Sequence, residues 1–188
     1  MIRLTDQKGF TLIEIIVVLV IMGLMLTIGG MPAFETWTAN MHIRGAADDL
    51  RANMQRARVE AIKQNSETAI IFDPVNNKYD FCTDSGDGDW ATPGDNSIAE
   101  TVYLSSYGSG VAYGHGNIPA GNSATTPPGP FFADDISYTA NRVVFNSRGT
   151  GSAGYVYLDN QRQDRVYAVG TQSSGNIVAR RWNGSDWE

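Results

Sequence analysis

The chain has 188 residues, a net charge of -6 and a pI near 4.8, so it is long enough for one globular domain with an appendage. Its acidic balance excludes a chain-wide field that attracts anionic partners, and nucleic acid would need a local basic patch. With 20 glycines and a charged fraction of 18%, the composition favours a loop-rich β domain over a helical one. A single cysteine, Cys82, excludes an intrachain disulfide, and we expect a buried reduced thiol.

The first element is an apolar run, Ile15 to Phe34, which holds twenty residues without a charge. A helix that rises about 1.5 Å per residue would span the roughly 30 Å of a bilayer core over this length. A cleaved secretory signal is disfavoured, because residues 31–33 (MPA) make a poor small-x-small site. The sequence therefore predicts a membrane-inserted helix.

Glu14 lies immediately before this run, and the apolar residues Leu12 and Ile13 precede it. An acid at mid-membrane costs about 2.5 to 3.5 kcal/mol, and less near a helix end. A charged residue in an apolar segment is usually stabilised by a partner of opposite charge, so we expect a cationic partner for Glu14.

The stretch KGFTLIE, residues 8–14, resembles the processing and methylation motif of type IV prepilins and type II secretion pseudopilins. The resemblance implies that a prepilin peptidase cleaves between Gly9 and Phe10, and that Phe10 is then N-methylated. It also implies that Glu14 pairs with the charged amino terminus of a neighbouring subunit. The implied partners are other pilin or pseudopilin subunits, the peptidase and methyltransferase, the inner-membrane assembly platform and membrane lipid.

The resemblance divides the chain into four parts. Residues 1–9 would be a leader, residues 10–32 a hydrophobic transmembrane and assembly helix, residues 33–65 an amphipathic stem, and residues 66–188 a β-rich extracytoplasmic domain. The expected location is the bacterial inner membrane, with the C-terminal domain in the periplasm or outside the cell after incorporation into a pilus or pseudopilus.

The stem continues the helix, because apolar residues recur there at spacings of three and four. This stripe is expected to be core and contains Ile43, Ala47, Leu50, Met54, Ala57 and Ala61. Gly29, Gly30 and Pro32 predict a bend or a weak point before it.

Beyond Gln64 the pattern changes to short strands separated by turn residues. The predicted strands are Thr68–Phe72, Lys78–Cys82, Thr101–Leu104, Arg142–Phe145, Tyr155–Leu158, Arg165–Val169 and Ile177–Trp182. Ser105 to Pro130 is expected to be a long loop. The fold class is α+β, a pilin-like fold in which a long N-terminal helix packs against an antiparallel sheet. The hairpin pattern of residues 143–178 is similar to that of the GspH and FimT group of minor pseudopilins and minor pilins.

Two weaker candidate sites remain in the domain. Asp84, Asp87 and Asp89 could supply oxygen ligands to a structural calcium ion, although their spacing is not that of an EF-hand and a solvated acidic loop is the alternative. Arg180 and Arg181, beside Trp182 and Trp187, could contact DNA, or they could belong to an edge strand with a packed tryptophan.

No catalytic constellation stands out in the sequence. Neither His42 nor His115 has a Cys or His at metal-ligand spacing, and residues 108–114 lack the spacing of a dinucleotide loop. We therefore expect a minor pilin or pseudopilin that works by assembly and is no enzyme, with no cofactor and with nucleic acid not expected as a partner. The alternatives are a DNA-binding minor pilin for uptake and an unassembled single-span membrane protein with a β ectodomain.

Overall fold

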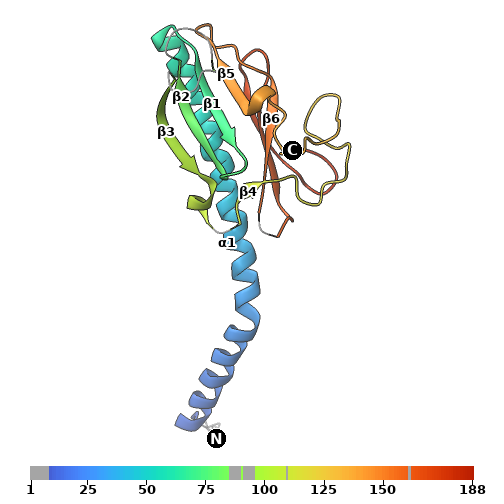
Figure 1. The fold of residues 1–188 in the computed structure, drawn as a ribbon. Helices are drawn as coiled ribbons and strands as arrows, with labels where there is room; N and C mark the ends of the chain where they lie inside the picture. The colour runs from blue at the N-terminus through green and yellow to red at the C-terminus, as the bar shows by residue number, and fades with distance from the viewer. Residues whose placement is uncertain (1–8, 85–89, 91–95, 109, 161) are drawn as a thin grey trace, which may run out of the picture. The chain divides into compact units, whose positions relative to one another are not determined.

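The computed structural model describes residues 9–84, 90, 96–108, 110–160 and 162–188, and for residues 26–33 it describes the backbone alone. The chain divides into two compact units, Met1–Thr38 and Ala39–Glu188. A single helix, α1 (Leu12–Gln64), has residues in both units (Figure 1).

In the first unit, α1 continues through Gly29, Gly30 and Pro32 without a break in its helical assignment. The bend predicted there stays a prediction. In the part of the chain that the structure describes, no helix meets the combined length and apolarity that a membrane span requires. The span expected from Ile15 to Phe34 likewise stays a prediction, and its side chains at residues 26–33 lie outside the described set.

In the second unit, the predicted apolar stripe of α1 is confirmed as core. All of its members are at most 1% exposed: Ile43, Ala47, Leu50, Met54, Ala57 and Ala61. The helix ends where Asn65 adopts a left-handed backbone with φ of 51°. The N–H of Ser66 then donates to the carbonyl of Ala61 at 3.2 Å, a Schellman-type ending that satisfies a free helix carbonyl.

Among the residues that the structure describes, the strands form two antiparallel sheets of four, where the sequence led us to expect one. The first has the order β3-β2-β1-β5 and consists of β1 (Thr68–Asp73), β2 (Lys78–Thr83), β3 (Ser97–Tyr103) and β5 (Arg142–Phe145). Its β1 strand pairs with β5, which lies about seventy residues further along the chain. Cys82 on β2 is buried and free, as expected.

The second sheet has the order β4-β6-β7-β8 and consists of β4 (Ala112–Tyr113), β6 (Gly154–Asp159), β7 (Val166–Thr171) and β8 (Ile177–Arg181). The two-residue β4 was missed, because it lies within the stretch predicted as a loop. The described part of the unit also contains two short 3-10 helices, η1 (Leu104–Tyr107) and η2 (Thr139–Asn141).

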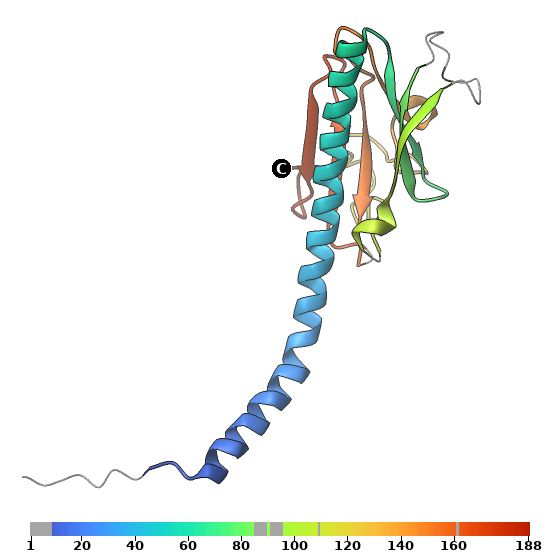
Figure 2. The same cartoon turned by 90° about the vertical axis from the view of Figure 1, so that its left-hand side faces the viewer.

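The main core lies between residues 43–61 of α1 and both sheets (Figure 2). Strand residues alternate between faces, so Val156 and Leu158 of β6 point into this core while Tyr155 and Tyr157 belong to a second cluster on the outer face.

At the C-terminal end of α1, two turns are packed too closely for side chains. Gly175 has φ of +79°, and a Cβ there would lie 1.9 Å from the carbonyl oxygen of Gly149. Arg58 Nε donates to the same carbonyl at 2.8 Å and so ties the helix to both turns.

Candidate functional site

The segment before α1 carries the predicted processing bond. Gly9 and Phe10 precede the helix and are not helical, and the side chain of Phe10 is 81% exposed. A Cβ added to Gly9 would have nothing described within 4 Å. Both residues are thus exposed among the described residues, and cleavage between them stays a prediction.

Thr11 caps the helix, and Glu14 is the partner that this cap contacts. The N–H of Glu14 donates to Thr11 Oγ1 at 3.4 Å and to the Thr11 carbonyl at 3.1 Å. The spacing is that of a Thr-x-x-Glu capping box at the start of a helix, where an acid is also favoured by the helix dipole. Sequence reasoning missed this role of Thr11, although the Thr-x-x-Glu spacing was a usable signal.

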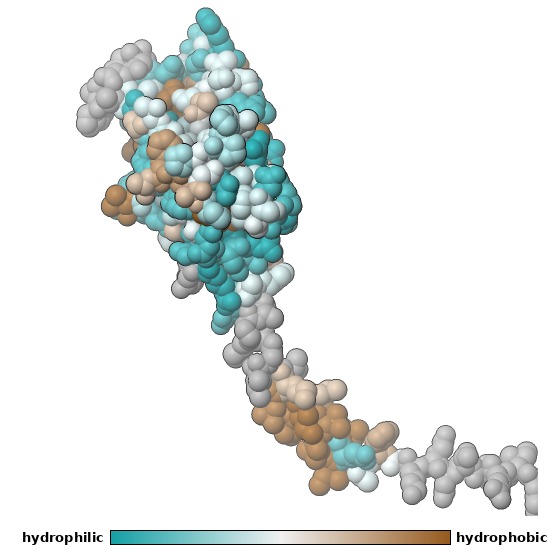
Figure 3. All heavy atoms as spheres, turned by 90° about the vertical axis from the view of Figure 1, so that its right-hand side faces the viewer, coloured by the Kyte–Doolittle hydropathy of each residue, from teal (hydrophilic) through white to brown (hydrophobic). Residues whose placement is uncertain are grey.

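Glu14 lies within an apolar surface, residues 10–25, that the rest of the described chain does not cover. Every large apolar side chain from Phe10 to Met25 is exposed: Phe10, Leu12, Ile13, Ile15, Ile16, Val17, Val18, Leu19, Val20, Ile21, Met22, Leu24 and Met25. Figure 3 shows the hydrophobic colour gathered on this segment. An apolar surface of this extent marks a site that another molecule or lipid covers. We call residues 9–25 the apolar arm.

Arg180 and Arg181 lie on β8, an edge strand, and both are already engaged within the chain. Arg180 Nη1 donates to the carbonyl of Ala124 at 3.2 Å, and its guanidinium lies 5.9 Å from the ring centre of Tyr155. Arg181 Nη2 bonds Glu188 at 2.7 Å. These contacts agree with the edge-strand alternative, and a DNA contact at the two residues stays a prediction.

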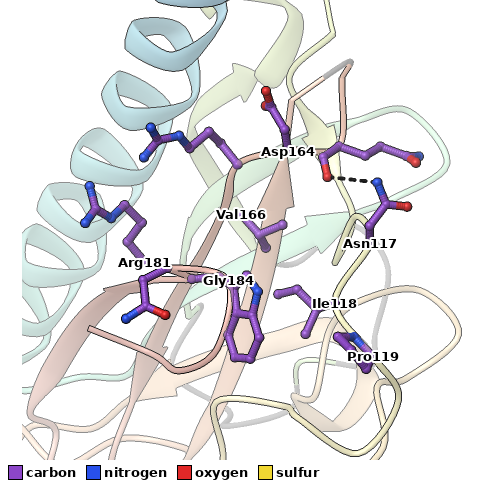
Figure 4. Close-up of a pocket in the computed structure, with 11 residues that line it drawn as sticks. Asn117, Ile118, Pro119, Asp164, Val166, Arg181 and Gly184 are labelled. Atoms are coloured by element: carbon purple, nitrogen blue, oxygen red, sulfur yellow. Dashed lines mark hydrogen bonds between the residues drawn. The ribbon is translucent and has the colours of Figure 1, made fainter.

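Arg181 also borders a surface pocket of about 640 Å³ (Figure 4). Asn117, Ile118 and Val166 line it as well, and Asn117 Nδ2 donates to the carbonyl of Gln163 at 3.2 Å across one side. Its lining mixes amides, an ion-paired arginine and apolar side chains, which identifies no particular chemistry.

The structure describes one of the three candidate calcium ligands and both histidines. Asp87 and Asp89 lie outside the described residues, and only Asp84 lies within them. The calcium site therefore remains a prediction. Within the described ranges, no group of three or more His, Cys, Asp or Glu side chains is arranged to hold a metal ion. His42 contacts the backbone at Gly108, whose missing Cβ would lie 2.1 Å from the ring, and His115 pairs with Asp135.

Comparison with known proteins places the sequence in a family. The sequence model for type II transport protein GspH matches residues 46–175, and that for the prokaryotic N-terminal methylation motif matches residues 4–30. Two fimbrial proteins of Pseudomonas aeruginosa are each 32% identical over 75 residues, which cover 40% of this chain and 47% of the relative. The chain thus spans about half the length of the curated relatives that it matches.

Solved structures of the minor pseudopilin EpsH, from the type 2 secretion system of Vibrio cholerae, are similar at low identity. Two of them share 13% of residues with this chain, cover 73% of it and 95% or 92% of their own lengths, and have TM-scores of 0.48 and 0.46. The family assignment rests instead on the sequence models, the first of which matches well over half of the chain. The chain therefore belongs to the family of type II transport protein GspH and carries the prokaryotic N-terminal methylation motif.

Proposed function

We propose that the chain is a minor pseudopilin or minor pilin, a structural subunit that joins a pseudopilus or pilus through its apolar arm. A prepilin peptidase cleaves between Gly9 and Phe10, and the new amino terminus is methylated. The observation that carries the proposal is Glu14, a carboxylate in the first turn of a helix whose neighbouring apolar side chains are all exposed.

The pairing of Glu14 with a neighbour's amino terminus follows from electrostatics. In the low dielectric of a filament core, opposite charges attract strongly, and a buried charge without a partner is costly. The pair forms at one register only, so it selects how subunits stack. Before assembly, lipid covers the arm and Glu14 lies close to the membrane interface, where its cost is smallest.

The role is one of assembly and not of catalysis, and the partners are other pilin-like subunits, the processing enzyme, lipid and an inner-membrane assembly platform. The β domain lies on the extracytoplasmic side. An unassembled single-span membrane protein with a β ectodomain is the competing function, and the experiments below separate the two.

Processing is tested by substitution at Gly9. Mass spectrometry of the protein from its host should show a chain that begins at methylated Phe10. Gly9→Leu should leave the leader attached. Gly23→Leu is the matched control, because Gly23 also has open space around it and lies in the same arm, but it lies outside the motif. An intact leader on the unsubstituted protein at steady state would contradict the proposal.

Assembly is tested by two substitutions at Glu14. Glu14→Gln keeps the residue type that a capping box accepts and removes the charge, whereas Glu14→Leu removes both. Incorporation into purified fibres should fall about tenfold or more in both variants, since a lost pair of about 1.4 kcal/mol already gives that factor. Membrane insertion should be unchanged or improved.

Glu35→Gln serves as the control, since it removes another acid of α1 and should leave incorporation intact. Normal incorporation of both Glu14 variants would show that the carboxylate has no assembly role. Deletion of the gene, followed by parallel assays of secretion, surface pili and DNA uptake, then separates a secretion role from a pilus role. Absence of the unsubstituted chain from fibres would favour the unassembled alternative.

A further inference from the structure

Three titratable side chains from three separate segments meet on the outer face of the second sheet. They are His115, two residues after β4, Asp135, in the segment before η2, and Asp159, the last residue of β6. His115 Nδ1 and Asp135 Oδ1 are in direct contact. We call these three side chains the acid cluster.

Asp159 is enclosed by backbone that leaves no room for more atoms. It is only 7% exposed, and a Cβ on Gly114 would lie 2.5 Å from its carboxyl carbon. The N–H of Gly116, which has φ of +54°, donates to this carboxyl group. Glycines at both positions therefore let the chain fold directly over the Asp159 side chain.

The acid cluster closes the two ends of a long segment, residues 114–135, which we call the cover loop. The loop lies over the aromatic outer face of the second sheet. The N–H of Ala124 donates to Tyr157 Oη at 2.9 Å, and Trp187 Nε1 donates to the Asn122 carbonyl at 2.8 Å. The ring of Phe131 stacks on the ring of His115, with 4.2 Å between their centroids. The two ends of the loop, which we call its neck, are therefore in contact with the part of the loop that covers the sheet.

Two carboxyl groups in this neck, those of Asp135 and Asp159, have raised pKa values. Burial, and after it the negative charge of Asp135, raise the pKa of Asp159 to about 6. Burial also raises the pKa of Asp135, against the lowering effect of His115. Asp134 adds a further negative charge beside Asp135, while the strands on either side of Asp159 place only Ala112 and Val166 opposite it.

We propose that the acid cluster is a pH-sensitive clasp for the cover loop, closed in mild acid and loosened at neutral and higher pH. In acid, the enclosed Asp159 is neutral and places no negative charge beside Asp135. At higher pH Asp159 ionises, and its enclosed carboxylate and that of Asp135 repel each other. Opening of the loop would expose the aromatic face formed by Tyr155 and Tyr157. This device does not depend on how the apolar arm assembles.

The sign of the pH dependence follows from linkage. The folded pKa of Asp159, about 6, lies above its ordinary value of 3.8, so the folded state binds the extra proton in that window. The contribution is fully present below the unfolded pKa and is lost as the pH rises through the folded one. The clasp should therefore weaken between about pH 4 and pH 7, opposite to the usual loss of stability in acid.

The test is thermal unfolding of the full chain in mild detergent between pH 5 and 7.5, with Asp159→Asn as the variant. Asn keeps the shape and an acceptor for Gly116 but cannot ionise. The Tm of the variant relative to the unsubstituted chain should rise by about 3 to 6 °C across this range, as expected for a carboxyl group with this raised pKa in a domain of this size. The matched control is Asp186→Asn, the same change at an exposed residue, for which the difference should stay flat.

Two measurements on the unsubstituted chain need no variant. Hydrogen exchange, corrected for the intrinsic effect of pH, should show the cover loop losing protection relative to the strands between pH 5 and 7.5. Carboxyl NMR should show Asp159 titrating between about pH 5 and 7. A titration near pH 4, cover-loop protection that stays constant or rises with pH, or a variant that tracks the unsubstituted chain at every pH would each overturn the proposal.

Discussion

Residues 12–25 and residues 43–61 belong to the same helix and are both rich in apolar side chains, yet their surroundings are opposite. In the first stretch the large apolar side chains are exposed, while in the second the apolar stripe is at most 1% exposed. The first is apolar on nearly all sides, whereas the second gathers most of its apolar residues on one face, and mostly polar residues, with Ala52 and Val59, occupy the other. The difference teaches that the angular spread of apolar residues, more than their number, indicates whether a helix is covered by its own chain or by something else.

The strongest test of this comparison is one substitution made in both stretches. Leu50→Ala, at 0% exposure, should lower the free energy of unfolding of the β domain by about 2 to 5 kcal/mol, because it leaves a cavity beside both sheets. Leu19→Ala, at 62% exposure, should change it by less than about 0.5 kcal/mol. Chemical denaturation in detergent measures both, and equal losses would refute the contrast.

The cap of the apolar arm gives a smaller effect. Thr11→Ala should destabilise the first turn of α1 by about 1 kcal/mol, since the N–H of Glu14 loses its side-chain acceptor. Thr38→Ala is the control, because the Thr38 hydroxyl donates only to helix carbonyls at Phe34 and Glu35. Hydrogen exchange of the amides that follow Thr11 distinguishes the two, and equal protection in both variants would leave Thr11 without a capping role.

Calcium binding would stabilise the β domain, which contains the second stretch of α1, and not the apolar arm. If the loop with Asp84, Asp87 and Asp89 binds the ion, millimolar calcium should raise the Tm of the domain by about 2 to 4 °C, which corresponds to about 1 kcal/mol of binding. Replacement of the three residues by Asn should remove the gain, and magnesium should not reproduce it. Absence of any shift would leave a plain acidic loop.

The smallest expected effect concerns DNA. Arg180 and Arg181 already contact Ala124, Tyr155 and Glu188, and the chain is acidic, so gel shifts should show no binding or weak binding that disappears at physiological salt. Arg180→Glu combined with Arg181→Glu should abolish any weak DNA binding that is seen. A charge reversal at Arg51 of α1 should leave that binding unchanged. Tight binding that survives the double change would place a nucleic-acid surface elsewhere.

Local patterns in the sequence were sufficient for most of the elements. The buried stripe of α1 and seven strands lie close to where periodicity placed them, since side-chain alternation and turn residues act over a few neighbours. The strand near Thr101 begins earlier than predicted, at Ser97, because its exposed side chains give no alternating signal. The motif at residues 8–14 likewise pointed to the family without any structure.

The sequence by itself therefore determined the helix, the strand segments, the family motif and the unusual position of Glu14, all of which depend on residues near one another in the chain. Only the tertiary structure decided that the strands form two sheets, that β1 pairs with β5, and that His115, Asp135 and Asp159 share one enclosure. These outcomes depend on which distant segments meet. That choice is set by packing on α1 and by the closure of long loops, for which a local pattern of residue types carries no signal.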